Sequence, residues 1–323
     1  MNASGGFSLI AFGARYGTLI ALVLLILFNL AFTRNFATLQ TLNVNLTQVC
    51  TIVIVATGMT LVIATGGIDL SVGSMMAIAG ALAPLIFLSP LFGGHVALAV
   101  AVAMVAAVLA ATLCGLFNGW LIAQFRIQPI VATLVLFIAG RGIAQALTNS
   151  NLQVFKVPEF QWIGLGRPLG IPVQVIVMIV LVALAAWMLR RTRFGRSILA
   201  TGGNERAAEL AGIGVKRTKL AVYAISGFCA GVAGLVIIAI NSASDANLVG
   251  LGMELDAIAA VAVGGTLLTG GRATILGTLM GALTIQLVRY TLLANGVPDA
   301  AALIVKAAII VVAVWLQQQR RDA

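Results

Sequence analysis

The sequence offers few side chains that could do chemistry, and they are not arranged for catalysis. The chain has 323 residues, with one histidine (His95), three cysteines and nine acidic residues. Cys50, Cys114 and Cys229 lie singly in apolar segments, without the C-x-x-C spacing of metal or redox sites, so we expect buried thiols. We therefore predict neither a metal site nor catalytic residues in this chain.

The two acidic residues nearest to each other, Glu254 and Asp256, are two positions apart. On a helix, such side chains point in different directions and cannot act on one substrate as a paired acid and base. We expect them in the first turn of a helix, where negative charge is favourable. The G-x-x-x-x-G-K-[ST] loop that cradles nucleotide phosphates is absent from the sequence, which predicts that this chain holds no ATP and no other cofactor of its own.

Asp69 is the one acidic residue in a plausible membrane position, within the segment 66–73, which reads GGIDLSVG. Its glycines, Gly66, Gly67 and Gly73, interrupt a helical pattern, while Asp69 and Ser71 are suited to cap the helix that restarts. Two interpretations remain open. The segment is either a plain turn between spans or a broken helix beside a transport path, a device that transporters use often.

A second interruption lies in the other half of the chain, at Gly264 and Gly265, followed by Gly270 and Gly271. One glycine-broken segment in each half suggests an internal repeat with a path at its interface. On that interpretation the path is bordered by these residues: Gly66, Gly67, Asp69, Ser71, Gly264 and Gly265.

The basic residues are concentrated in the segment 190–219, which holds eight of the nineteen Lys and Arg residues and is flanked by apolar runs. Positive charge near span ends marks the cytoplasmic face. Within this segment we expect a helix of about two turns, with Asn204 as its N-cap, Glu205 in its first turn and Gly212 or Gly214 at its end. A helix that short is marginal alone, so we expect it to dock on another protein through its small residues, Ala207, Ala208 and Ala211.

The composition identifies the class of protein. Hydrophobic residues make up 61% of the chain and charged residues 9%, with a mean hydropathy of +1.11, whereas soluble domains are about a quarter charged. The net charge of +10 is explained by basic loops and span ends rather than by nucleic-acid binding. We predict an all-α integral membrane protein with both termini cytoplasmic and ten spans, at 16–32, 43–65, 74–92, 96–122, 130–147, 173–189, 220–240, 255–268, 274–293 and 301–316.

Three motifs resemble the membrane subunits of ribose-type ABC importers, and the likeness covers nearly the whole chain. They are ATGMTLVI (56–63) running into GGIDLSVG, GNERAA (203–208) followed by Gly212, and ELDAIA (254–259) followed by the two glycine pairs. The residues RIQP (126–129), ATL (132–134) and AGRG (139–142) look most similar to the galactofuranose permeases within that group.

The resemblance implies a single permease domain, 1–323, with the ABC importer permease fold in a bacterial inner membrane. It implies a second permease subunit, identical or related, two cytoplasmic ATPases and a periplasmic sugar-binding protein. It also makes 203–212 the segment that faces the ATPase, through Gly203, Asn204, Glu205, Ala207, Ala208 and Gly212. The implied function is import of a simple sugar. The rival functions are a permease for another small solute, a secondary transporter and an integral membrane enzyme.

Overall fold

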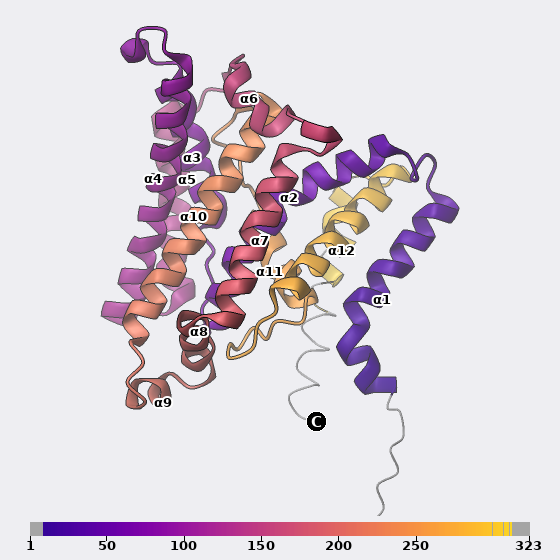
Figure 1. Cartoon of the computed structure of the whole chain (residues 1–323), viewed down its shortest axis with the longest axis vertical. Helices are drawn as coiled ribbons and strands as arrows, with labels where there is room; N and C mark the ends of the chain where they lie inside the picture. The colour runs from indigo at the N-terminus through magenta and orange to yellow at the C-terminus, as the bar shows by residue number, and fades with distance from the viewer. Residues whose placement is uncertain (1–8, 299, 306, 310, 312–323) are drawn as a thin grey trace, which may run out of the picture.

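The computed structural model describes residues 9–298, 300–305, 307–309 and 311, and it is almost entirely helical (Figure 1). In chain order the α-helices are α1 (Leu9–Phe32), α2 (Leu39–Ala64), α3 (Val72–Phe87), α4 (Val96–Phe125), α5 (Pro129–Thr148), α6 (Pro158–Leu165), α7 (Val173–Arg191), α8 (Arg193–Gly203), α9 (Glu205–Leu210), α10 (Val215–Asn241), α11 (Met253–Val263) and α12 (Ile275–Ala294). The short elements are η1 (Pro90–Phe92), β1 (Gln153–Val154), η2 (Pro168–Gly170) and β2 (Ala243–Ser244).

Six helices of the described residues are long and apolar enough to cross a membrane: α2, α4, α5, α7, α10 and α12. Three shorter apolar helical stretches match further predicted spans: Gly17–Phe32 within α1, Val72–Phe87, which is α3, and Ala300–Ile309. The prediction of a helical membrane protein is confirmed, while the count of ten crossings remains a prediction. The last predicted span, 301–316, lies partly outside the described residues.

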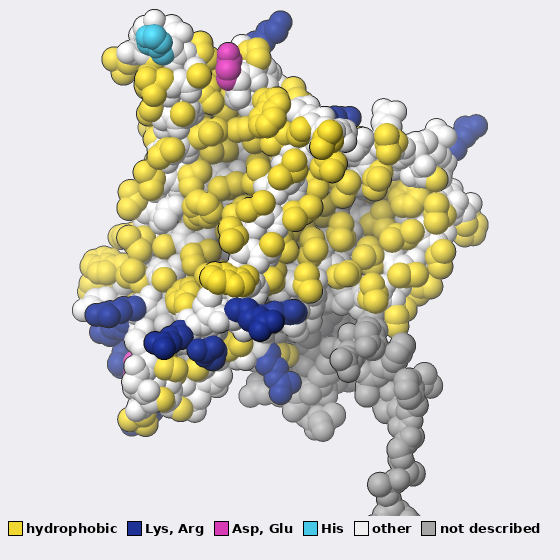
Figure 2. All heavy atoms as spheres, viewed as in Figure 1, with side chains coloured by type: hydrophobic (Ala, Val, Ile, Leu, Met, Phe, Trp, Pro, Cys, Tyr) yellow, Lys and Arg dark blue, Asp and Glu magenta, His cyan; other side chains and the backbone are white. Residues whose placement is uncertain are grey.

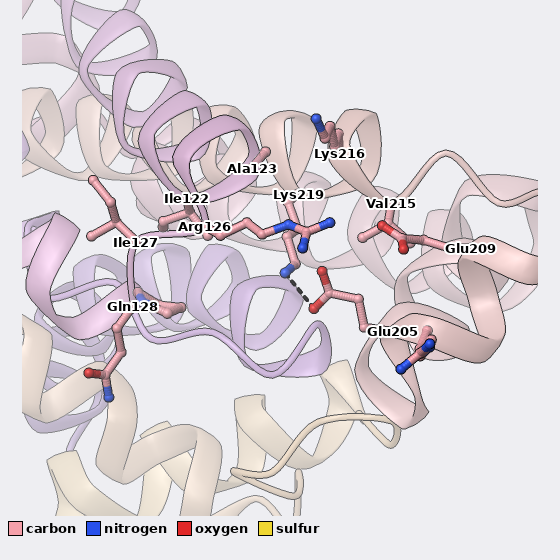
Figure 3. Close-up of a pocket in the computed structure, with 12 residues that line it drawn as sticks. Ile122, Ala123, Arg126, Ile127, Gln128, Glu205, Glu209, Val215, Lys216 and Lys219 are labelled. Carbon is pink, nitrogen blue, oxygen red and sulfur yellow. Dashed lines mark hydrogen bonds and ion pairs between the residues drawn. The ribbon is translucent and has the colours of Figure 1, made fainter.

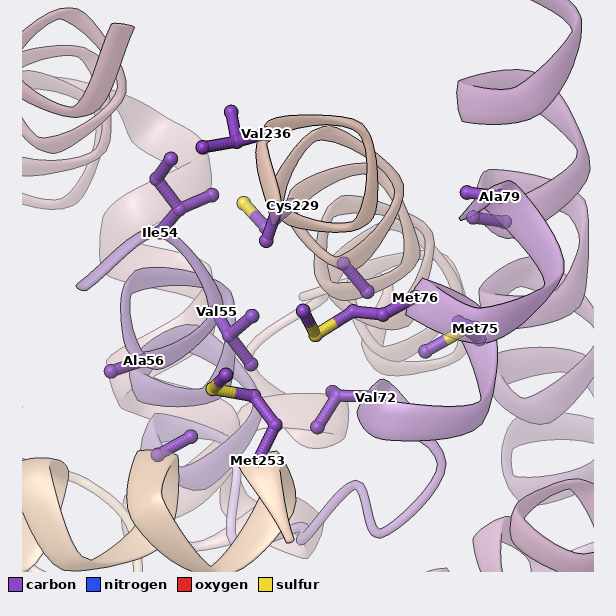
Figure 4. Close-up of a cluster of buried hydrophobic side chains, with 14 of the residues drawn as sticks. Ile54, Val55, Ala56, Val72, Met75, Met76, Ala79, Cys229, Val236 and Met253 are labelled. Carbon is purple, nitrogen blue, oxygen red and sulfur yellow. The ribbon is translucent and has the colours of Figure 1, made fainter. Parts of the chain in front are cut away.

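The core forms around α2, in which every residue from Val49 to Ala64 is buried. Helices α7, α10, α11 and α12 all pack against it. Figure 4 shows side chains from four helices meeting in this core: Val55 on α2, Met76 on α3, Cys229 on α10 and Met253 on α11. Cys50 and Cys229 are buried free thiols, as expected, and Cys114 is partly buried.

Helices α4 and α10 make the most extensive helix pair, through small residues. A Cβ added to Gly115 would lie 3.0 Å from the Cα of Gly227, and one added to Gly231 would lie 3.0 Å from the Cα of Val108. Because lipid chains are as apolar as leucine, membrane helices associate through such close packing rather than through the hydrophobic effect. Small residues thus let α4 and α10 approach each other closely.

The surface has an apolar belt and a basic edge. Leucines on the outward face of α4, such as Leu109 and Leu113, are more than half exposed. In Figure 2 apolar side chains cover most of the visible face, and Lys and Arg side chains gather along its lower edge, where Figure 1 shows α8, α9 and the start of α10. An exposed apolar belt above a basic edge is the pattern expected of a protein in lipid.

At the opposite end, connecting segments are held by polar contacts. Strands β1 and β2 pair antiparallel, with Gln153 opposite Ser244. Arg141 lies on α5 near this end. In the structure its Nη1 donates to the carbonyl oxygens of Ala246 at 2.8 Å and Val249 at 2.6 Å. These bonds fasten α5 to the segment between β2 and α11.

The arrangement generates a topology prediction. Single cysteines replacing Asn151 and Asp245, next to the paired strands, should be labelled by an impermeant reagent only from outside the cell. A cysteine replacing Arg193 at the basic edge should be labelled only after the membrane is opened, because positive loops stay inside. Labelling of Asn151→Cys from the cytoplasmic side alone would contradict this topology. The predicted cytoplasmic termini, at Asn2 and Arg320, lie outside the described residues.

Candidate functional site

The basic segment 190–219 contains two short helices rather than the one expected. Thr192 caps α8 by accepting a hydrogen bond from the N–H of Gly195 at 3.1 Å. Phe194 and Ile198, one turn apart, turn inward, and Ile198 is fully buried. Helix α8 was not predicted from the sequence, although its cap residue and its i, i+4 apolar pair both indicate a helix.

Helix α9 is defined at both ends as the sequence predicts. Asn204 accepts a hydrogen bond from the N–H of Ala207 at 3.0 Å, and Gly212 takes the left-handed conformation, with φ of +79°. The N–H groups of Gly212 and Ile213 return to the carbonyls of Glu209 and Ala208, both at 3.0 Å. This pattern closes a helix end. Gly214, the alternative end, instead precedes α10 with a negative φ.

One expectation about α9 is wrong. Ala208 does not face outward toward another protein but is 4% exposed and packs against the chain itself. The helix is therefore held within this chain by its caps and by this contact. Ala207 and Ala211 remain exposed, and Leu210 is 85% exposed at the outermost turn. Leu210 is thus the large apolar side chain that α9 exposes.

The end of α8 meets both glycine-broken segments at one point, which we call the glycine junction: Ala64–Gly66, Gly202–Gly203 and Gly270–Gly271. The N–H of Gly271 donates to the carbonyl of Ala64 at 3.1 Å. A Cβ on Gly202 would overlap that same carbonyl and lie 2.6 Å from the nitrogen of Gly271. Backbone from the two halves of the chain thus packs directly against the base of α9.

In the first broken segment, Gly66 and Gly67 are each suited to their positions for a different reason. Gly66 has φ of +80°, a conformation that side chains with a Cβ rarely adopt. Gly67 has no such φ, but a Cβ there would collide with the hydroxyl of Tyr223 on α10. That hydroxyl donates to the carbonyl of Ile68 at 3.4 Å. The contact with Tyr223 could not be read from the sequence, because 155 positions separate it from Ile68.

Asp69 is fully buried and its carboxylate is satisfied by protein donors. Its Oδ1 accepts from the N–H of Ser71 at 3.0 Å and from the Ser71 hydroxyl at 2.7 Å, and its Oδ2 accepts from the Ser226 hydroxyl at 2.8 Å. Ser71 in turn accepts from the amide of Asn118 at 2.8 Å. Asp69 thus binds the start of α3 as predicted, whereas Ser71 makes no side-chain cap and instead links Asp69 to α4.

The second broken segment follows α11. Gly264 ends this helix and packs against α12, since a Cβ there would lie 2.5 Å from the carbonyl carbon of Gly277. Gly265 turns the chain with φ of +81°. Glu254 and Asp256 lie in the first turn of α11, as predicted.

A large pocket opens between α9, the start of α10 and the α4–α5 connection (Figure 3). Its volume is about 680 Å³. Lys219 and Glu205 form an ion pair at 2.7 Å, and Arg126 enters the pocket from the end of α4. Glu205, assigned to the coupling segment from sequence, thus lines a pocket and fastens α9 to α10. No group of metal-binding side chains is found in the described residues.

The packing at Gly67 can be tested by pairing two substitutions. Gly67→Ala should lower the free energy of unfolding by about 1–3 kcal/mol, because its methyl group must displace the hydroxyl of Tyr223. Tyr223→Phe removes that hydroxyl, so the double variant should recover most of the loss. Thermal unfolding of the purified variants in detergent measures both effects. A Gly67→Ala protein as stable as the parent would mean that this contact does not constrain the segment.

Comparison with known proteins gives consistent relatives. The chain is 42% identical over 309 residues to the ribose import permease RbsC of Escherichia coli K12, which covers 94% of each chain. It is 40% identical over 275 residues to the galactofuranose transporter permease YtfT of the same organism, covering 85% of this chain and 79% of the relative. The fructose import permease FruF of Bifidobacterium longum is 38% identical over 82% of this chain and 73% of its own length. Residues 41–314 match the family described as the permease component of branched-chain amino acid transport systems, and the chain belongs to that family.

Proposed function

We propose that this chain is a membrane-spanning subunit of an ATP-driven importer and that it moves a simple sugar across the bacterial inner membrane. The observation that carries the proposal is the geometry of α9. This helix is closed at both ends by the chain's own hydrogen bonds, exposes Leu210 and is backed by the glycine junction. The related ribose, galactofuranose and fructose permeases favour a sugar of similar size, such as galactofuranose or ribose.

The mechanism that we infer runs from α9 to the membrane interior. A cytoplasmic ATPase pushes on the exposed side of α9, around Leu210 and Ala207. The push passes through Gly202 to the ends of the two broken segments, because their backbones are in direct contact there. Because protein interiors are close-packed and hardly compressible, a displacement of one packed element moves the elements in contact with it. ATP binds and is hydrolysed on the partner subunit, and this chain supplies no catalytic residue.

The path is proposed to run beside the broken segments, at Gly66, Gly67, Asp69, Ser71, Gly264 and Gly265. Non-helical backbone at membrane depth is tolerated only where protein or a cavity surrounds it. The assembly is proposed to contain a second permease subunit, identical or related, two ATPases and a periplasmic sugar-binding protein, with both termini of this chain cytoplasmic.

A secondary transporter is the second candidate function, because Asp69 is a carboxylate at membrane depth. Its oxygens, however, already accept three hydrogen bonds from Ser71 and Ser226. A carboxylate so occupied acts as a structural clamp rather than as a carrier of protons, which favours the importer.

Uptake into vesicles tests the function and the role of Leu210 together. Vesicles holding this chain with its ATPase and sugar-binding protein should take up labelled ribose or galactofuranose only when ATP is inside with the ATPase. Leu210→Ser should weaken retention of the ATPase by about fivefold to tenfold, since a large apolar anchor is lost from the contact.

The matched control is Leu91→Ser, which alters an equally exposed leucine in η1 at the other end of the molecule. This variant should retain the ATPase as the parent does. Uptake driven by a proton gradient without ATP would refute the importer. Normal ATPase retention by Leu210→Ser would refute the docking role of that side chain.

A further inference from the structure

The pocket beside α9 has a lining that suits an anionic amphiphile. Four cationic side chains and two carboxylates line it, a formal balance of +2, and apolar residues, of which only Ile127 and Pro129 are more than slightly exposed, make up part of its wall. The cations are Arg126, Arg206, Lys216 and Lys219, the carboxylates are Glu205 and Glu209, and the apolar residues are Ile122, Ala123, Ile127, Pro129 and Val215. Charged side chains next to apolar ones are complementary to a charged lipid headgroup and the apolar chain joined to it.

Not every cationic side chain of this pocket forms a hydrogen bond or an ion pair within the described residues. Lys219 is paired with Glu205 at 2.7 Å, and Lys216 donates to the amide oxygen of Gln124 at 3.2 Å. For Arg126, no hydrogen bond or ion pair is found among the described residues. It is exposed and follows α4 in the left-handed conformation, with φ of +56°. Figure 3 shows Arg126, Lys219 and Glu205 directed into the same space from three different elements.

The pocket lies at the border of the apolar belt rather than at the outermost tip of the molecule. It is bounded by the end of α4, the start of α5 and the start of α10, where the long apolar helices terminate. Just before this end, α4 carries the aromatic side chains Phe117, Trp120 and Phe125, whose rings contact one another and are all exposed. Exposed tryptophan beside basic residues marks the level of lipid headgroups.

The pocket and the tip of α9 are different faces of that helix. Glu205 and Glu209, one turn apart, share the pocket side. Leu210 lies about 100° round the helix from Glu209 and does not line the pocket, although Arg206, one turn before Leu210, reaches its rim. A protein that docks on Leu210 therefore does not have to fill the pocket, which leaves the pocket open toward the membrane border.

We propose that this pocket binds the headgroup of an anionic phospholipid from the cytoplasmic leaflet. Basic pockets between helix ends on this side of a membrane attract such headgroups, by charge and by proximity to the lipid surface. The phosphate sits among Arg126, Lys216 and Lys219, and the glycerol end of the lipid lies along Ile127 and Pro129. Bound there, the lipid bridges α4 and α10 to α9 and braces the coupling segment, so transport depends on anionic lipid.

The test measures phospholipid retained by the full-length chain. The protein is purified in mild detergent from vesicles of equal phosphatidylglycerol and phosphatidylcholine, and the lipid that remains bound is quantified. The parent should retain phosphatidylglycerol in preference. Arg126→Gln with Lys216→Gln should weaken that retention by about fivefold for each cation removed, because each near-surface cation contributes to attraction of anionic lipid.

Two further variants separate site binding from general attraction and from misfolding. Arg190→Gln with Arg191→Gln removes two cations from the end of α7, outside the pocket, and should leave most of the retention intact. Glu209→Gln removes a carboxylate from the pocket and should raise retention above that of the parent, an increase that misfolding does not produce. Equal losses in the two paired variants, or no gain with Glu209→Gln, would overturn the proposal.

Two further measurements distinguish the alternative occupants, one on the same preparation and one on the complex with the ATPase. Millimolar inorganic phosphate should not displace the retained phosphatidylglycerol, because it lacks the apolar part that the wall contacts. Complete displacement would mean that the pocket takes a free anion. If the Arg126→Gln, Lys216→Gln variant keeps phosphatidylglycerol but loses the ATPase, the pocket belongs to the protein contact and the lipid proposal fails.

Discussion

The arrangement of this protein depends on backbone packing against backbone where no Cβ fits. At the glycine junction, Gly202 at the end of α8 lies against the carbonyl of Ala64 at the end of α2, and Gly271 donates to that same carbonyl at 3.1 Å. Two segments that interrupt the helices of the two halves are thereby joined to the base of α9. In a membrane, where apolar surface gains little from leaving lipid, such close contact is a principal source of specific association.

The polar groups near these breaks follow from the same constraint. Interrupting a helix inside a packed protein frees backbone groups that need polar partners, and each unsatisfied group away from water would cost several kcal/mol, by order of magnitude. Asp69, Ser71, Asn118 and Ser226 supply such partners by linking α3, α4 and α10. At the basic edge, the ion pair of Lys219 with Glu205 and the proposed lipid hold α9 from a different side than the one that Ala208 buries.

Much of the fold could be predicted from sequence because its signals are local. Apolar runs gave the membrane helices, and Asn204 and Gly212 marked the ends of α9 through capping chemistry that involves only nearby backbone. Contacts between distant segments could not be predicted in this way. The collision that excludes a side chain at Gly67 comes from Tyr223, and the inward face of Ala208 is decided by where α8 and α10 place α9. Periodicity within one short helix carries no information about either.

The transmission of motion through the glycine junction is tested most directly by two neighbouring glycines that differ in their surroundings. A Cβ at Gly202 would overlap the carbonyl of Ala64, whereas a Cβ at Gly203 would meet nothing within 4 Å. Substrate-stimulated ATP hydrolysis should be measured for Gly202→Ala and Gly203→Ala in the reconstituted complex, with ATPase retention recorded for both. The account predicts that Gly203→Ala behaves as the parent and that Gly202→Ala loses stimulation while the ATPase remains bound. Equal stimulation in the two variants would contradict it.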